Sequence, residues 1–340
     1  MKVCIFGAGA IGGFVGASLA AVPDVDVSLV ARGAHLAAMR DAGLRLLIDG
    51  QERVARVRCT DHPAELPPQD YVIVALKAHA ITEAVDAIVP LLGPDTSIVT
   101  MSNGIPYWYF HDRGGPLAGT ILQTIDPDAR QWRQLGPERA IGAVVFPAAE
   151  VVAPGVVRHE YGRKIPLGEP SGQRTERIVR LQAMLEAGGL EAPIRDDIRD
   201  EIWLKLWGNL CFNPVSALTH ATVDVIATDP GTLAVCRSMM TEAAAIAERL
   251  SVQLRVDMER RIAGAAAIGP HKMSMLQDLE RGRSMEIDPL VGVVQELGRL
   301  TGVATPAIDI VLALIRQRAR SAATESAPKR TNGGRPCRPF

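Results

Sequence analysis

Residues 2–13 read KVCIFGAGAIGG and place three glycines directly after a short β-prone run. Gly7, Gly9 and Gly12 have the spacing Gly-x-Gly-x-x-Gly. Between a strand and a helix, the first glycine permits a tight turn, the second lets a pyrophosphate approach the backbone, and the third lets the helix pack on the strand. A glycine-rich helix packed tightly on a sheet is the alternative, but the flanking strand and helix favour a dinucleotide site. The residues of this predicted phosphate cradle are Gly7, Ala8, Gly9, Ala10, Ile11 and Gly12.

The rest of the first half alternates β-rich and helical segments. The strand-like runs lie at 2–6, 25–32, 71–77, 97–103, 140–148, 155–162 and 163–169. This order predicts an α/β domain with a doubly wound parallel sheet of the Rossmann type. Residues 44–59 contain an Asp49-Gly50 turn between two strand-like runs, so we expect a hairpin added to that sheet.

From Asp196 onward the pattern changes to helices only, with apolar residues three and four positions apart. This change predicts a cofactor-binding domain at 1–196 and an all-helical substrate domain at 197–320. Asp196 or Asp197 is expected to cap the first of these helices, because an aspartate oxygen accepts hydrogen bonds from first-turn amides. Residues 321–340 are polar, basic and rich in Gly and Pro, so we expect a disordered tail.

The composition excludes several classes of function. The 340 residues have a formal net charge of -1, which offers no field for nucleic acid. The five cysteines are scattered without a Cys-x-x-Cys pair, which fits a reducing cytoplasm better than a disulfide framework. The sequence contains no His-Glu-x-x-His pattern and no run of about 18 uninterrupted apolar residues. We therefore expect a cytoplasmic enzyme without a metal site and without nucleic-acid or membrane partners.

Three residues after strands are candidates for holding the cofactor. Arg32 stands about 20 residues past the glycines, where an NAD enzyme usually has Asp or Glu on the ribose hydroxyls. Arginine there suits a 2′-phosphate, so NADP is favoured over NAD, with an exposed strand-end arginine as the alternative. Lys77 and Asn103 follow the next two strands, and ligands of open α/β sheets bind at such carboxyl ends. An exposed lysine and an Asn-Gly turn explain these two residues equally well.

Residues 201–214, EIWLKLWGNLCFNP, read as a buried helix with one polar stripe. Lys205, Asn209 and Asn213 recur every four residues and therefore share one face. The lysine could reach solvent and the asparagines could be satisfied core amides, or all three could line a cleft against the nucleotide domain. Their alignment on so apolar a helix favours the cleft. Pro214 is expected to end or kink the helix.

A second polar segment, 271–288, reads HKMSMLQDLERGRSMEID, and Ser274 is a candidate cap for a helix starting at Met275. With GAGAIG, ALKA, SNG and RDEIWLKLWGNLCFNPVSAL, this segment makes residues 2 to about 318 resemble the ketopantoate reductase family, also called 2-dehydropantoate 2-reductases. The resemblance implies NADPH-dependent reduction of a 2-oxo acid, 2-dehydropantoate, to pantoate. It also implies a Rossmann domain followed by an all-helical domain of the 6-phosphogluconate dehydrogenase-like type.

The same resemblance implies roles for individual residues. Lys205 would be the proton donor, and Glu286 would lie near it and near the nicotinamide ribose. The implied substrate-binding residues are Asn103, Asn209, Asn213 and Ser274. The implied cofactor-binding residues are the phosphate cradle, Arg32, Lys77, Asn103, Ala149 and Glu286. An ammonium aimed at the ketone oxygen can stabilise an alkoxide and protonate it; burial would lower its pKa and a nearby carboxylate would oppose that shift.

Residues 105–139 depart from compact family members as an insertion that is rich in aromatic residues. These are Tyr107, Trp108, Tyr109, Phe110 and Trp132. The insertion could roof the active site, or it could form an aromatic patch for a homodimer contact. A second departure is that His220, Thr222 and Asp224 stand where some members have an asparagine. Both departures leave open a different 2-oxo or β-keto acid as substrate, and a non-catalytic NADP-sensing module is the third hypothesis.

Overall fold

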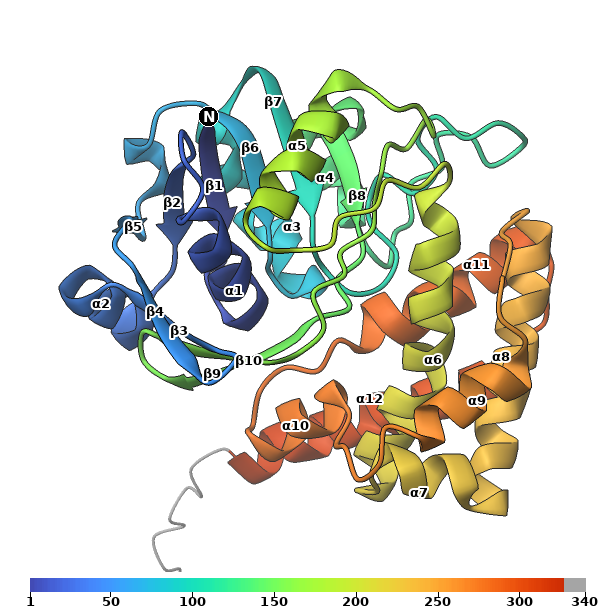
Figure 1. Cartoon of the computed structure of the whole chain (residues 1–340). Coiled ribbons are helices and arrows are strands. Elements are labelled where there is room, and N and C mark those ends of the chain that lie inside the picture. Colours follow the sequence, from blue (N-terminus) through green and yellow to red (C-terminus); the bar gives the residue numbers. More distant parts are fainter. Residues whose placement is uncertain (327–340) are drawn as a thin grey trace, which may run out of the picture.

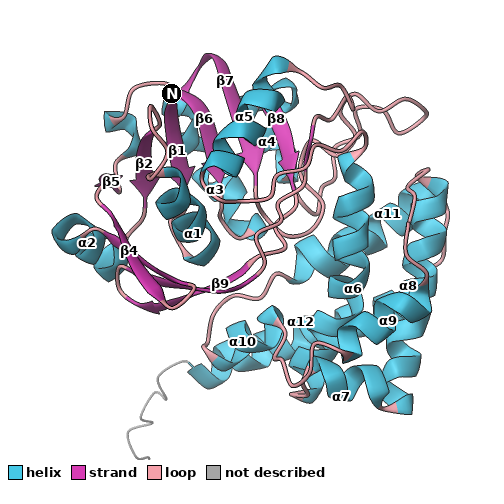
Figure 2. Cartoon of the chain, viewed as in Figure 1, coloured by secondary structure: helices cyan, strands magenta, loops and turns pink. Residues whose placement is uncertain are grey.

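The computed structural model describes residues 1–326, which form a sheet-containing half followed by a helical half (Figures 1 and 2). The main sheet has seven strands in the order β11-β8-β7-β6-β1-β2-β5. Its strands are β1 (Lys2–Phe6), β2 (Asp26–Val30), β5 (Arg58–Thr60), β6 (Gln69–Val74), β7 (Leu92–Thr100), β8 (Ala140–Ala143) and β11 (Leu167–Gly168). All neighbours pair in parallel except β11, which is antiparallel to β8. The predicted parallel Rossmann-type sheet is confirmed.

The central strand β1 is buried on both faces. Its successive residues point to opposite sides, so Cys4 and Phe6 join one hydrophobic core while Val3 and Ile5 join another. Helices cover both faces of the sheet (Figure 2). The helices of this half are α1 (Ala10–Leu19), α2 (Gly33–Ala42), α3 (Ala78–Ile88), α4 (Arg130–Leu135) and α5 (Glu176–Ala187). Short 3-10 turns lie at Pro63–Glu65, Val89–Leu91, Pro127–Ala129 and Pro137–Arg139.

The hairpin predicted within residues 44–59 forms, but its assignment to the main sheet is wrong. Asp49 and Gly50 both have positive φ, 52° and 72°, as a two-residue turn of the primed type requires. The hairpin strands β3 (Leu44–Ile48) and β4 (Gln51–Ala55) instead join β9 (Ala148–Ala153) and β10 (Val156–Tyr161) in a second sheet, ordered β4-β3-β10-β9. This sheet packs on α1, whose Gly13 lies directly against Val157. Helix α1 thus packs on the main sheet with one face and on the second sheet with another. The hairpin strands help to bury its apolar residues on that second face.

The helical half begins with α6 (Ile198–Thr219), which is capped as predicted: the Asp197 carboxylate accepts a hydrogen bond from Arg199 N at 3.0 Å. Of the two outcomes expected at Pro214, the end of the helix is wrong, since α6 continues to Thr219, and the kink stays a prediction. Proline removes one backbone hydrogen bond, but Val215 and Ala217 bury the following turn. The remaining helices are α7 (Val223–Thr228), α8 (Pro230–Arg249), α9 (Met258–Ala266), α10 (Ser274–Glu280), α11 (Val293–Thr301) and α12 (Pro306–Ser326), with a π-helical turn at Asp288–Gly292.

The beginning of α6 supports the predicted domain division at 196/197, which remains our proposal. The predicted disordered tail is wrong at its start, because α12 carries the chain to Ser326. The other residues of that tail, 327–340, lie outside the described part of the chain. None of the helices within residues 1–326 combines the length and apolarity that a membrane span requires.

Candidate active site

A narrow cavity lies where β7 and β8 end against α6. It has about 20 Å³ of free space, close to the room that one water needs. Its lining residues are Thr100, Ser102, Asn103, Gly104, Pro106, Trp108, Ala143, Val144, Ile202, Lys205, Leu206 and Asn209. The cavity thus brings together Asn103, Lys205 and Asn209, which the sequence analysis had selected from segments about one hundred residues apart. Its position at the carboxyl ends of parallel strands is the usual one for ligands of such sheets.

The Lys205 ammonium donates a hydrogen bond to the Val145 carbonyl oxygen. Part of the residue's surface remains exposed, but the ammonium itself is desolvated. This burial lowers the pKa of Lys205 to about 8, and the negative charge of Glu286 opposes the shift. The sequence-based expectation for both effects is confirmed. At neutral pH this lysine is a protonated acid that gives up its proton more readily than an exposed lysine does.

The Glu286 carboxylate joins the two halves of the molecule behind that lysine. Its Oε2 accepts a hydrogen bond from Asn103 Nδ2 at 2.9 Å, and its Oε1 accepts one from Ala78 N at 3.1 Å. Ala78 is the first residue of α3, so the carboxylate also interacts favourably with the positive end of that helix. Glu286 is only 7% exposed. These contacts hold its charge in one place.

Asn213 and Ser274 are predicted site residues that the structure joins to each other. Asn213 Oδ1 accepts hydrogen bonds from Ser274 Oγ at 3.0 Å and from Met275 N at 3.1 Å. Neither residue is among those that line the cavity. Ser274 is not the cap of α10, because Met273 holds the cap position and the Asn213 amide serves the first-turn N–H instead. Within residues 1–326, Asn213 Nδ2 is buried without a hydrogen-bond partner.

The other predicted cofactor residues lie outside the cavity. Lys77 Nζ donates to Asp278 Oδ2 and to the Ser284 carbonyl, both at 2.7 Å, so it links α3 to the helical half. Arg32 is exposed at the N-cap position of α2. Ala149 lies on β9 of the second sheet, which packs against α1. The Lys77–Asp278 contact was not anticipated, since nothing in the spacing of two residues so far apart along the chain signals it.

The phosphate cradle has the geometry that its glycines predict. Gly7 has φ of 102°, and a Cβ on Gly12 would lie 2.1 Å from Gly7 O, so a side chain is excluded there. A Cβ on Gly9 would meet no described atom within 4 Å and would project into open space. The N-terminus of α1 is left uncapped by the side chains of residues 1–326. The amides of Gly7, Ala8 and Gly9 donate to backbone carbonyls, so the first-turn amides of α1 after Gly9 are the groups that fit a pyrophosphate.

The insertion at 105–139 does not form an exposed aromatic patch. Tyr107, Trp108, Tyr109 and Phe110 are at most 3% exposed, so the suggested dimer patch is corrected. Trp108 and Pro106 instead line the cavity. Neither Pro106 nor Trp108 was predicted as an individual site residue, although both follow Asn103 closely in the chain and could have been selected for that reason.

A dinucleotide cradle on a parallel sheet, facing a helical half that presents a desolvated lysine, defines a Rossmann-type oxidoreductase. Family comparison gives the more specific assignment. Residues 3–172 match the family described as Ketopantoate reductase PanE/ApbA, and residues 197–319 match Ketopantoate reductase PanE/ApbA C terminal. The chain belongs to the ketopantoate reductase family, as the sequence resemblance predicted.

Known relatives agree over nearly the whole chain. A 2-dehydropantoate 2-reductase of Mesorhizobium japonicum is 58% identical over 93% of this chain and 97% of its own. A solved structure from Ralstonia solanacearum is 43% identical, with a TM-score of 0.90 over 94% of this chain and 98% of that one. The structure of 2-dehydropantoate 2-reductase from Geobacter metallireducens is 28% identical, with a TM-score of 0.82 over 93% of this chain and 99% of that one.

Residues 1–326 contain no group of three or more His, Cys, Asp or Glu side chains that could hold a metal ion.

Proposed function

We propose that the chain reduces the ketone of 2-dehydropantoate to pantoate with NADPH, using Lys205 as the proton donor. The observation that carries this proposal is the desolvated Lys205 ammonium, which shares its cavity with Asn103 and Asn209 and is backed by Glu286. The names of the relatives support the same substrate, since the 58% identical one is a 2-dehydropantoate 2-reductase.

A bound nicotinamide nucleotide supplies the hydride for the ketone carbon. The ketone oxygen then gains negative charge, and the Lys205 ammonium stabilises that charge and donates an Nζ proton to it. Because the pKa of Lys205 is lowered to about 8, the lysine is mostly protonated at neutral pH yet is a stronger acid than an ordinary ammonium. The substrate oxygen replaces Val145 O as the partner of the ammonium. The neutral amine afterwards regains its proton from solvent.

The remaining site residues position the substrate. Asn103 and Asn209 face the same cavity as Lys205, so their amides can hold the polar groups of a 2-oxo acid. Ser274 is an exposed residue and would bind the substrate carboxylate by turning its hydroxyl proton, which it donates to Asn213 Oδ1 in this structure, toward the substrate. Glu286 holds Asn103 in place and keeps Lys205 protonated.

The family supports a nicotinamide nucleotide as the cofactor, and we propose NADPH in particular. The cradle from Gly7 to Gly12 would hold the pyrophosphate. Arg32 would pair with the 2′-phosphate, because its exposed guanidinium stands at the end of β2 and the N-terminus of α2. Lys77, Asn103, Ala149 and Glu286 complete the proposed cofactor set. A homodimer and a cytoplasmic location remain predictions from the sequence.

A panel of oxo acids tests the proposal directly. NADPH oxidation by the purified chain is followed with 2-dehydropantoate, other 2-oxo acids and β-keto acids. We expect the highest kcat/KM with 2-dehydropantoate. A clear preference for another acid would favour the second hypothesis, for which the insertion-derived wall of the cavity is the specific observation. Binding of NADPH without oxidation by any acid would leave only the sensing module.

A further inference from the structure

The cavity has two chemically different ends. The partly exposed end carries the polar residues Ser102, Asn103, Lys205 and Asn209. The buried end is apolar apart from one hydroxyl, and its residues are Thr100, Pro106, Trp108, Ala143, Val144, Ile202 and Leu206. A 2-oxo acid has the same division, since its carboxylate and ketone are polar and the carbon group beside the ketone can be apolar. When the ketone of such an acid meets Lys205, we expect its carbon group to lie against the buried apolar lining residues.

Trp108 is the largest of the buried lining residues, and its indole is held in place on two sides. The residue is 0% exposed, and its Nε1 donates a hydrogen bond to Thr100 Oγ1 at 3.0 Å. Its six-membered ring lies against β8 at Gly142, where a Cβ would come within 2.7 Å of Trp108 Cη2. The absence of a side chain at Gly142 thus makes the room that the indole occupies. A rigid ring held on two sides therefore limits the space in the cavity.

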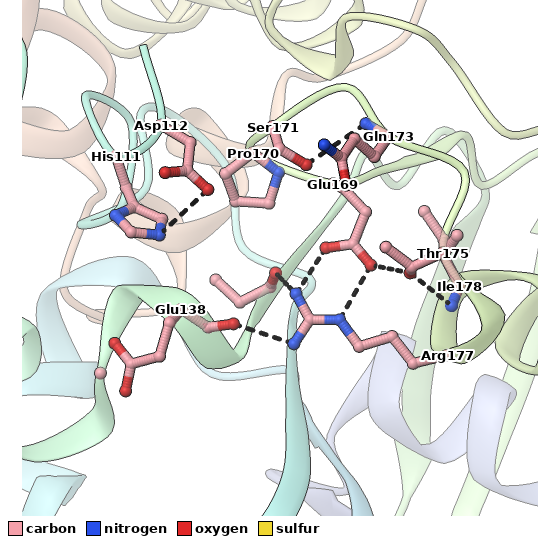
Figure 3. A network of polar contacts seen from close by, with 12 residues as sticks. His111, Asp112, Glu138, Glu169, Pro170, Ser171, Gln173, Thr175, Arg177 and Ile178 are labelled. Atoms are coloured by element: carbon pink, nitrogen blue, oxygen red, sulfur yellow. Dashed lines mark hydrogen bonds and ion pairs between the residues drawn. The ribbon is translucent and has the colours of Figure 1, made fainter.

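The segment that carries Trp108 is anchored to the rest of the fold. Arg199 of α6 is buried and donates to the carbonyls of Tyr109 at 2.9 Å and His111 at 2.7 Å. Trp203 Nε1 donates to the Tyr109 hydroxyl at 2.7 Å. Near the other end of the insertion, Arg177 donates to the Glu138 carbonyl at 2.9 Å, as Figure 3 shows.

The same guanidinium pairs with the buried Glu169 carboxylate, which is 1% exposed (Figure 3). Moving the Arg177 guanidinium away would leave the buried Glu169 carboxylate unpaired, which is costly. The insertion is therefore a fixed wall rather than a mobile lid.

We infer that Trp108 is a specificity-determining residue that limits the size of the carbon group beside the ketone. The free space of about 20 Å³, close to the room that one water needs, leaves no place for an aromatic ring beside the ketone while Trp108 stands there. This inference rests on the proposed function, because it needs a 2-oxo acid with its ketone at Lys205.

The test compares two 2-oxo acids in the full-length enzyme with NADPH. One is 3-methyl-2-oxobutanoate, with an isopropyl group beside the ketone, and the other is 2-oxo-2-phenylacetate, with a phenyl group there. In the Trp108→Leu variant we expect the ratio of kcat/KM for the phenyl acid over the isopropyl acid to rise about tenfold or more. Trp108→Phe should shift it less in the same direction. Trp132→Leu, a tryptophan of the same insertion outside the cavity, is the matched control and should leave it unchanged.

The result separates the two proposals. An unchanged ratio in Trp108 variants that still bind NADPH and unfold cooperatively would overturn the inference while the wild-type activity stands. An equal shift in Trp132→Leu would overturn it too, because the effect would then belong to the insertion as a whole. If Trp108→Leu does not fold, Trp108→Phe, which keeps an aromatic ring, decides the question. Wild-type inactivity with every 2-oxo acid would instead refute the proposed function and the inference with it.

Discussion

The proposed phosphate cradle and the proposed catalytic cavity differ in how the chain builds them. The cradle is a single turn from Gly7 to Gly12, and its working groups are backbone amides. The cavity is built from residues 100–209, with Glu286 behind it, and its working groups are side chains. A backbone site can be recognised from local spacing, whereas a side-chain site depends on tertiary packing. The two sites should therefore fail in different ways when they are mutated.

The largest effect is expected at the side-chain site. Lys205→Ala removes the ammonium that, in the proposed mechanism, stabilises and protonates the ketone oxygen, so kcat should fall about 100- to 10,000-fold. Binding of NADPH, measured by titration of its fluorescence, should be nearly unchanged because the cradle is intact. Lys272→Ala is the matched control, since that lysine pairs with Glu280 on the surface. Near-normal turnover in Lys205→Ala would remove Lys205 from the mechanism.

Two substitutions within the cradle should separate folding from cofactor binding. In Gly12→Ala the new Cβ meets Gly7 O at 2.1 Å, and relieving such a contact typically costs about 1–3 kcal/mol. Alanine gains about 0.5–1 kcal/mol inside a helix, so the clash with rigid backbone wins. Both the unfolding temperature and NADPH affinity should fall. In Gly9→Ala the Cβ enters open space, so affinity alone should fall. Equal unfolding temperatures for the two variants would contradict this division.

Arg32→Ala tests the edge of the cradle, where a side chain replaces backbone as the recognition element. Losing one charge-assisted contact to the 2′-phosphate should lower kcat/KM for NADPH about tenfold, with kcat/KM for NADH unchanged. Arg53→Ala, an exposed arginine on β4, provides the control. Equal losses with both cofactors would show that Arg32 acts on something other than the phosphate.

The sequence predicted the cradle, the parallel sheet and the Lys205 stripe because each rests on short-range periodicity. It misplaced the hairpin at Asp49-Gly50, since a hairpin signal specifies the turn and not the sheet that the strands join. The expected end of the helix at Pro214 was wrong for a related reason. Burial of the next turn of α6 outweighs the one backbone hydrogen bond that proline removes.

Within the site, Lys205, Asn209 and Asn103 meet as expected, but Asn213 lies one turn beyond the cavity with Ser274. A helical stripe drifts with each turn, so four-residue spacing alone does not say where a cleft ends. The role of Trp108 depends on the space left by Gly142 on another strand, which no local pattern records.

The smallest effect is expected from changing the charge next to the lysine. The Glu286 carboxylate raises the pKa of Lys205, so Glu286→Gln should lower that pKa further below its ordinary value. The ammonium is the active form, and activity is lost as pH rises through its pKa, near 8 in the wild type. The basic limb of the kcat/KM profile should therefore move to lower pH in Glu286→Gln. The position of the limb does not depend on any accompanying loss of rate from the weakened Asn103 contact. Glu280→Gln, a change on the surface, should not move the limb, and an unmoved limb in Glu286→Gln would assign it to a group other than Lys205.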